Sequence, residues 1–158
     1  MQLFKNNGYE FIEFVELKEE DIPSYHPLGG SFAVLTSLGK YLLCYNTWTE
    51  QWEVPVGHRE VNETSKECAI RELYEETGQT VKDLDFKGLV KTKNLSNGKI
   101  KYNPVYFASI NKLQPFLKNP ETSKIFLWDL KEKIESVDEV DFAILNTLSI
   151  TGTNNVPK

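Results

Sequence analysis

The chain has 158 residues, of which 40% are hydrophobic, and its formal net charge is −5 at pH 7. This length suffices for one domain with a hydrophobic core, so we expect a single domain over residues 1–150. The negative charge argues against general affinity for duplex nucleic acid, because cationic contacts to phosphates dominate such binding. The N-terminus does not combine a cationic start with an apolar run, and no stretch reaches the roughly 18 apolar residues of a membrane span. We therefore expect a cytoplasmic protein without a membrane partner.

Seven segments have the composition of strands. Alternating or continuous apolar runs bounded by Gly, Pro and Asn predict strands at Tyr9–Leu17, Ser31–Thr36, Tyr41–Tyr45, Trp52–Val54, Phe86–Thr92, Ile100–Ile110 and Ile125–Trp128. The dipeptide Asn97-Gly98 lies between two of these runs and supplies the positive φ values of a tight turn. The segments around Val90 and Tyr102 are therefore expected to pair antiparallel.

Two segments change to helical periodicity. Apolar residues recur at helical spacing over Thr64–Thr77, and Gly78 is suited to end that helix. A second helix is expected over Val137–Leu148. The tail at 151–158 has no apolar periodicity and is predicted to be disordered. Strands with interspersed helices indicate an α+β fold, in which helices cover the faces of a mixed sheet.

The two cysteines, Cys44 and Cys68, lie in apolar surroundings and lack CxxC spacing. Cysteines of this kind are more often reduced core residues than members of a disulfide or a zinc site. We therefore expect both thiols to be free and buried.

The first helix carries a cluster of glutamates near its C-terminal end. Glu72, Glu75 and Glu76 stand at i, i+3 and i+4, so their side chains emerge on nearly one face. Three neighbouring carboxylates are the oxygen ligands that a hard divalent cation such as Mg²⁺ requires. On the charge pattern alone, a metal site and a solvated acidic face explain the cluster equally well.

The spacing around the cluster favours the metal site. Gly57 is followed after five residues by Glu63 and, after seven more, by the segment Arg71–Gln79. At frequencies of about one in fifteen per residue type, such a set of identities arises by chance roughly once in a million chains of this length. The segment Gly57–Gln79 resembles the Nudix box, the loop–helix–loop signature of Nudix hydrolases, and all seven fixed Gly, Glu and Arg positions match. Gln79 is the one clear mismatch, because the box prefers an apolar residue there.

The resemblance implies a role for each matched residue. Glu75 and Glu76 are similar to the principal metal ligands of the family, and Glu72 to a further ligand or to the base that activates water. Glu63 and Arg71 resemble the pair whose ion bridge orients the helix and its carboxylates. Without the arginine, the crowded glutamates would partly protonate or move apart.

Further candidates lie outside the fixed positions of the box. The backbone carbonyl of Val56 is similar to a family metal ligand that precedes the box glycine. Trp48 could stack on a nucleobase, although simple exposure explains it equally well. Arg59 could contact a substrate phosphate, although a solvated loop residue is the better explanation. Family members often take a general base from elsewhere, and three acids are unranked candidates here: Glu121, Asp138 and Glu139.

The resemblance extends over Ser31–Leu148 and leaves residues 1–28 without a recognised motif. It implies an α/β/α sandwich and Mg²⁺-dependent or Mn²⁺-dependent hydrolysis of a diphosphate linkage. The expected partner is a small nucleoside diphosphate linked to another group, by default a nucleoside triphosphate or oxidised nucleotide as for MutT-like enzymes. Many members dimerise, so a homodimer stays open beside a monomer.

The same fold also admits two alternative functions. A ligand sensor without turnover would be marked by loss of box residues such as Glu76 or Arg71, and none is lost. An isomerase acting on an isoprenoid diphosphate would need a catalytic cysteine, for which Cys44 and Cys68 are poorly placed.

Overall fold

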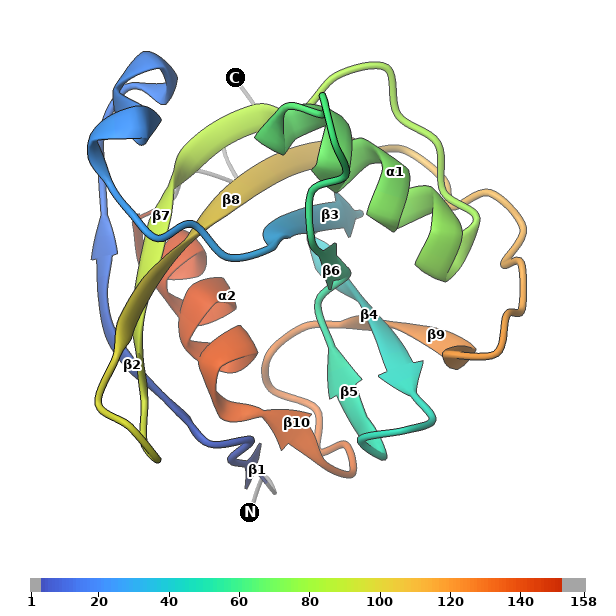
Figure 1. Ribbon diagram of the computed structural model, residues 1–158. Coiled ribbons are helices and arrows are strands. Elements are labelled where there is room, and N and C mark those ends of the chain that lie inside the picture. The colour runs from blue at the N-terminus through green and yellow to red at the C-terminus, as the bar shows by residue number, and fades with distance from the viewer. Residues whose placement is uncertain (1–3, 152–158) are drawn as a thin grey trace.

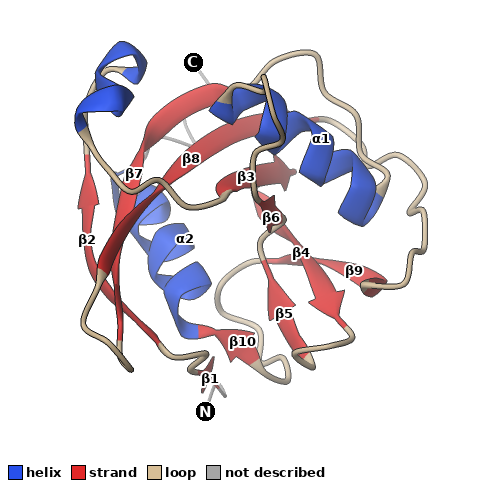
Figure 2. Ribbon diagram, viewed as in Figure 1, coloured by secondary structure: helices blue, strands red, loops and turns tan. Residues whose placement is uncertain are grey.

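The computed structural model describes residues 4–151, in which strands alternate with two α-helices and one 3-10 helix (Figures 1 and 2). The elements in chain order are β1 (Phe4–Lys5), β2 (Tyr9–Val15), η1 (Glu19–Ser24), β3 (Ser31–Ser37), β4 (Lys40–Asn46), β5 (Gln51–Glu53), β6 (Val56–Gly57), α1 (Ser65–Thr77), β7 (Asp85–Asn94), β8 (Ile100–Ile110), β9 (Thr122–Trp128), β10 (Val137–Asp138) and α2 (Glu139–Thr151).

The predicted strands and helices are all present, with shifted ends, and the short elements β1, η1, β6 and β10 were not predicted. Two boundaries differ. The predicted second helix begins two residues later, because Val137–Asp138 pairs in the sheet as β10. The same helix continues to Thr151, which the sequence assigned to a disordered tail. The rest of that predicted tail lies outside the described residues.

The strands form one mixed sheet in the order β1-β10-β5-β4-β3-β8-β7-β2, with β6 joined to β3 and β9 joined to β4. β3 runs parallel to β8 and antiparallel to β4. Successive strand residues face opposite sides of a sheet. Accordingly, Val34 belongs to one apolar cluster while Ala33 and Leu35 belong to the other.

Each helix covers one of these two clusters. α2 contributes Ile144 and Leu148 to the first, and α1 contributes Ala69 and Leu73 to the second. Figure 1 shows the two helices on opposite sides of β3 and β8. This arrangement confirms the predicted α+β fold, an α/β/α sandwich. In residues 4–151 the helices are too short or too polar to span a membrane.

The β7–β8 hairpin has the predicted pairing but a wider turn. Val90 lies opposite Asn103, and both strands are antiparallel. Gly98 has a φ of 74°, and its N–H donates to the carbonyl of Asn94 at 2.7 Å. The N–H of Asn94 in turn donates to the carbonyl of Lys99 at 2.8 Å. These bonds enclose a four-residue loop, and of Asn97 and Gly98 only the glycine has a positive φ, so the expected tight turn with positive φ at both residues is wrong.

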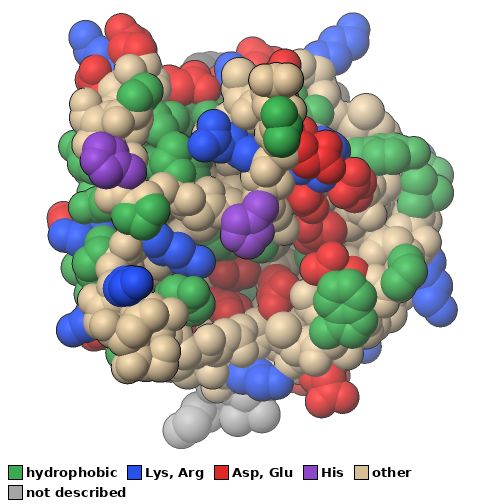
Figure 3. Space-filling model, viewed as in Figure 1, with side chains coloured by type: hydrophobic (Ala, Val, Ile, Leu, Met, Phe, Trp, Pro, Cys, Tyr) green, Lys and Arg blue, Asp and Glu red, His purple; other side chains and the backbone are tan. Residues whose placement is uncertain are grey.

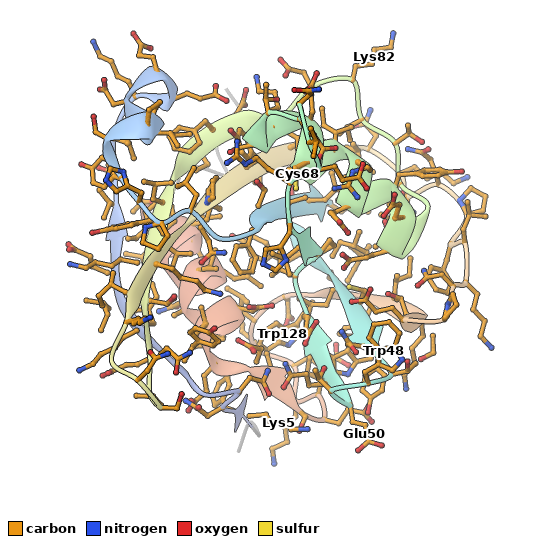
Figure 4. The ribbon with its side chains drawn as sticks, viewed as in Figure 1. Lys5, Trp48, Glu50, Cys68, Lys82 and Trp128 are labelled. Carbon is orange, nitrogen blue, oxygen red and sulfur yellow. The ribbon has the colours of Figure 1, made fainter. Side chains whose placement is uncertain are left out.

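Both cysteines are buried and free, as expected. Cys68 lies on the buried face of α1, where its thiol donates to the carbonyl of Gly57 at 3.1 Å (Figure 4). Burial raises the pKa of both thiols, which keeps them protonated.

Candidate active site

Local sequence fixes both ends of α1. The Thr64 side chain accepts a hydrogen bond from the N–H of Glu67, and the Glu67 carboxylate accepts one from the N–H of Thr64. Gly78 ends the helix with a φ of 84°, and its N–H donates to the carbonyl of Tyr74. Both features satisfy backbone groups that a helix end leaves unpaired. Because Leu73 is fully buried against the sheet, the glutamate-bearing faces of α1 have a fixed direction.

Arg71 joins α1 to the loop before it. Its Nε and Nη2 donate to the two oxygens of Glu63 at 2.7 and 3.0 Å. Nη1 donates to Glu72 at 2.9 Å and to Glu75 at 3.1 Å, and Nη2 also donates to the carbonyl of His58 at 3.0 Å. These hydrogen bonds hold the pKa of Glu63 below its usual range. The structure therefore contains the predicted Glu63–Arg71 ion pair.

Three carboxylates are neighbours beside β6. Glu76 is only 5% exposed, and within the described residues its Oε2 has no hydrogen-bond partner. Burial raises the pKa of Glu76, and the nearby carboxylates of Glu72 and Glu121 raise it further. The pKa of Glu121 is raised by burial and by neighbouring acids, including Glu72. An unpartnered buried oxygen among like charges fits a divalent cation, which would balance the repulsion.

Glu75 lies at the exposed edge of this cluster, where it shares Nη1 of Arg71 with Glu72. Its side chain is 52% exposed and pairs with Arg71. As the side chains lie, no three His, Cys, Asp or Glu groups within residues 4–151 converge closely enough to hold a metal ion. Glu75 would therefore have to leave Arg71 to join Glu72 and Glu76 on a cation, and the ligand roles of all three remain predictions.

The short strand β6 brings backbone against the same carboxylates. It pairs antiparallel with β3, with Val56 opposite Phe32. The backbone of Val56 hydrogen-bonds to the Glu76 carboxylate, which lowers the pKa of that group slightly against the larger effects. A Cβ at Gly57 would lie 2.0 Å from Cδ of Glu72, so only glycine allows this close approach. The Val56 carbonyl is thus near the site, and its role as a ligand stays a prediction.

A cleft of about 570 Å³ extends from this acidic cluster across the molecule. Its wall includes Arg71, Glu72 and Glu121 from the α1 and β9 side, and Lys101 and Asn103 from β8. Figure 3 shows the hollow in the middle of this face, with acidic side chains along its wall and floor. A volume of this order accommodates a ligand the size of a single nucleotide.

Two predicted substrate contacts lie away from this cleft. Trp48, on the turn between β4 and β5, is 70% exposed and does not belong to the cleft wall (Figure 4). Arg59 lines a second hollow of about 460 Å³ together with Tyr106. His58, the neighbour of Arg59 in the sequence, lines the main cleft.

Sequence reasoning missed two acids at the cleft. Glu53 has a raised pKa because of burial, although three side chains donate hydrogen bonds to it. Asp141 is 5% exposed and accepts a hydrogen bond from the N–H of Val54 at 2.8 Å. Its pKa is raised well above the usual value by burial and by the charges of Asp138 and Glu53. A carboxylate inside an apolar run, as for Glu53, was the available signal.

Comparison with known proteins agrees with this geometry. The NUDIX domain model matches residues 29–144. Over 110 residues the chain is 34% identical to "Putative 8-oxo-dGTP diphosphatase YtkD" of Bacillus subtilis (strain 168), covering 67% of this chain and 68% of that protein. The crystal structure of the Bacillus subtilis pyrophosphohydrolase BsRppH superposes with a TM-score of 0.65 at 27% identity, covering 89% and 90% of the two chains.

A MutT protein from Methanosarcina mazei Go1 has a TM-score of 0.66 over 81% of this chain and 97% of its own, and at 19% identity it shows the fold alone. The family match spans the box, the sheet and the start of α2, and it agrees with the ion pair and carboxylates found beside β6. The chain therefore belongs to the NUDIX family and is a Nudix hydrolase acting on diphosphate linkages.

Proposed function

We propose that this chain is an Mg²⁺-dependent pyrophosphohydrolase of nucleoside triphosphates, including oxidised ones. The observation that carries the proposal is the position of Glu72 and Glu121 in the wall of a cleft of single-nucleotide size, next to the buried Glu76. Further support comes from the relative YtkD, whose name describes an 8-oxo-dGTP diphosphatase. A small nucleotide suits this cleft better than a large polymer does.

The cation would be held by Glu72, Glu76, Glu121 and the Val56 carbonyl, with Glu75 as a further ligand. When bound, Mg²⁺ or Mn²⁺ supplies charge neutralisation on the diphosphate and a lowered pKa for water. The buried Oε2 of Glu76, which has no hydrogen-bond partner among residues 4–151, and the close approach of Gly57 to Glu72 fit such an ion. Mg²⁺ is favoured over metals that prefer nitrogen or sulfur ligands, because the donor atoms of this site are all oxygens.

The side chains of the chain itself supply positioning and proton transfer. Glu72 is the leading candidate for the general base, because its carboxylate lines the cleft and can accept the proton of the attacking water. Arg71 orients that carboxylate through the 2.9 Å hydrogen bond from Nη1. Attack of water on a phosphorus atom breaks one P–O bond of the anhydride, and two phosphate-bearing products leave.

The test is product release from a panel containing GTP, dGTP, 8-oxo-dGTP, ATP, ADP-ribose and a dinucleoside polyphosphate, with Mg²⁺ or with EDTA. Glu76→Gln is expected to lower kcat by about a hundredfold or more, because it removes one of the charges that face the reaction centre. Glu16→Gln is the matched control, since Glu16 is exposed and directly follows β2.

Each outcome has a definite meaning. Metal-dependent turnover of a nucleoside triphosphate that Glu76→Gln loses and Glu16→Gln keeps would support the proposal. Preferred turnover of ADP-ribose or a dinucleotide would overturn the substrate assignment. Binding without turnover by the wild type would favour a ligand sensor instead.

A further inference from the structure

Gln79 is the one residue that departs clearly from the box, which prefers an apolar side chain at this place. The side chain of Gln79 is nevertheless fully buried. Burying an amide without hydrogen bonds is unfavourable, so the partners of this side chain show what the residue does. Gln79 directly follows Gly78, which ends α1, and so it lies close to the glutamates of that helix.

Gln79 binds the backbone of Gln114 at two points. Its Oε1 accepts a hydrogen bond from the N–H of Gln114, and its Nε2 donates to the carbonyl of the same residue, both at 2.8 Å. The side chain of Gln114 in turn binds Thr80, because its Oε1 accepts from the Thr80 hydroxyl and its Nε2 donates to the Thr80 carbonyl, both at 2.9 Å. A leucine at position 79 would fill the space but leave the backbone of Gln114 without these partners.

Gln114 lies in the segment between β8 and β9, residues 111–121, which we call the β8–β9 connection. Figure 1 shows this connection running past the C-terminal end of α1. The N–H of Leu117 donates to the carbonyl of Thr77 at 3.3 Å, and Nδ2 of Asn119 donates to the carbonyl of Glu76 at 3.2 Å. Both carbonyls belong to the last turn of α1, which has no partners of its own for them. The connection is therefore fixed to the helix that bears the box glutamates.

The β8–β9 connection ends in Glu121, the acid from outside the box that lines the cleft beside Glu72. Oδ1 of Asn119 accepts hydrogen bonds from the N–H groups of Glu121 at 3.1 Å and of Thr122 at 2.9 Å. The single side chain of Asn119 thus joins the backbone of Glu121 to the carbonyl of Glu76. The contacts of Gln79 hold the same connection farther from the cleft.

The sheet alone sets the position of Glu121 incompletely. β9 pairs with β4, but the register shifts between Cys44 and Asn46, and Asn46 lies opposite Thr122, the first residue of β9. Such an irregularity disrupts the hydrogen-bond ladder locally. The contacts with α1 supply a fixed reference at the point where the strand pairing is irregular.

We propose that Gln79 and Asn119 are positioning residues for Glu121, because they fasten the β8–β9 connection to the end of α1 and hold this carboxylate beside that of Glu76. Carboxylates that share Mg²⁺ must lie within narrow limits, since this ion demands nearly ideal octahedral geometry. The departure of Gln79 from the box thereby gains a role in the reaction. This inference rests on the proposed function, in which Glu76 and Glu121 hold the same cation.

The test measures the Kd of Mn²⁺ without substrate, from the electron paramagnetic resonance signal of the free ion. Gln79→Leu removes both contacts with Gln114, and Asn119→Ala removes the bonds to Glu76 and Glu121. We expect the Kd to rise about tenfold in each variant, as is usual when a group that orients a metal ligand is lost. Asn146→Ala is the matched control and should keep the wild-type Kd, because Asn146 is exposed on α2 and lies outside the cleft wall.

A double-mutant cycle separates positioning from a merely structural role. Glu121→Gln alone should also weaken Mn²⁺ binding. If Gln79 acts through Glu121, Gln79→Leu has no further effect on the Kd in the Glu121→Gln background, whereas independent effects would multiply. Thermal unfolding checks that each variant folds. If Gln79→Leu does not fold, the same cycle with Asn119→Ala decides, since Asn119 is only partly buried.

The outcomes distinguish this inference from the proposed function. Coupled losses of Mn²⁺ affinity, with no hydrolysis of nucleotides by the wild type, would support the positioning role and overturn the proposed enzymatic function. Multiplying losses, or an unchanged Kd in Glu121→Gln or in the folded positioning variants, would overturn the positioning role. Nucleotide turnover that Glu76→Gln loses would in that case still support the enzymatic function. Failure of the wild type to bind Mn²⁺ would overturn both.

Discussion

Replacing Arg71 with lysine removes a guanidinium fork while keeping its positive charge. Arg71 is 21% exposed and makes five hydrogen bonds to carboxylate and carbonyl oxygens. A lysine ammonium cannot reproduce the planar two-point contact with Glu63, which is itself only 13% exposed. If lysine loses three of these five hydrogen bonds, and each contributes only about 1 kcal/mol because the site is partly exposed, the free energy of unfolding falls by roughly 3 kcal/mol.

The assay is urea unfolding at pH 7, followed by tryptophan fluorescence, because Trp52 and Trp128 are buried in the core. Arg59→Lys is the matched control, since Arg59 is the other arginine of the chain and lies outside the Arg71 network. A loss for Arg71→Lys that equals the control, or that stays below about 0.5 kcal/mol, would refute the view that the fork holds the loop against α1.

Three further predictions concern single positions. Asp141→Asn should stabilise the chain increasingly as the pH rises from about 4 to 7. The reason is that a buried acid with a raised pKa destabilises the folded state once the pH exceeds the pKa of the acid in the unfolded chain. Urea unfolding at both pH values checks this, and an equal effect at both would contradict it. Gly57→Ala should lower kcat about a hundredfold with folding retained, because the added Cβ would displace the side chain of Glu72. Near-normal turnover would show that the close approach of Gly57 to Glu72 is not needed for the reaction. Gly78→Ala, at a φ of 84°, should lower Tm by about 3–6 °C in calorimetry, and an unchanged Tm would count against strain at this helix end.

The parts of the site that local sequence determines were predictable. The helix α1 carries its own start and stop signals in Thr64 and Gly78, and the spacing from Gly57 to the glutamates does not depend on distant segments. The prediction of the Glu63–Arg71 pair succeeded for the same reason, since the two residues are only eight positions apart in the sequence.

The prediction failed where long-range pairing decides the structure. Glu121 could not be ranked among the candidate acids, because it reaches the site through the pairing of β4 with β9, where the N–H of Thr47 donates to its carbonyl at 2.8 Å. The residues of β10 have helical spacing with α2 in sequence, yet Val137 pairs with Trp52 and with Phe4. Neither contact can be predicted from the pattern of a few neighbouring residues, because each joins segments that are far apart in the sequence.

The same distinction bears on how specificity could change in this fold. Two of the three carboxylates beside β6, those of Glu72 and Glu76, belong to the continuous box, so we expect a change at either to affect the reaction itself. Asn6 and Asn7 donate to Glu139 and Asp138 at the start of α2, and within residues 4–151 neither side chain hydrogen-bonds to Arg71 or to the glutamates of α1. The family match over residues 29–144 contains both the box and the acids at the start of α2, so it identifies the reaction class without selecting a nucleotide.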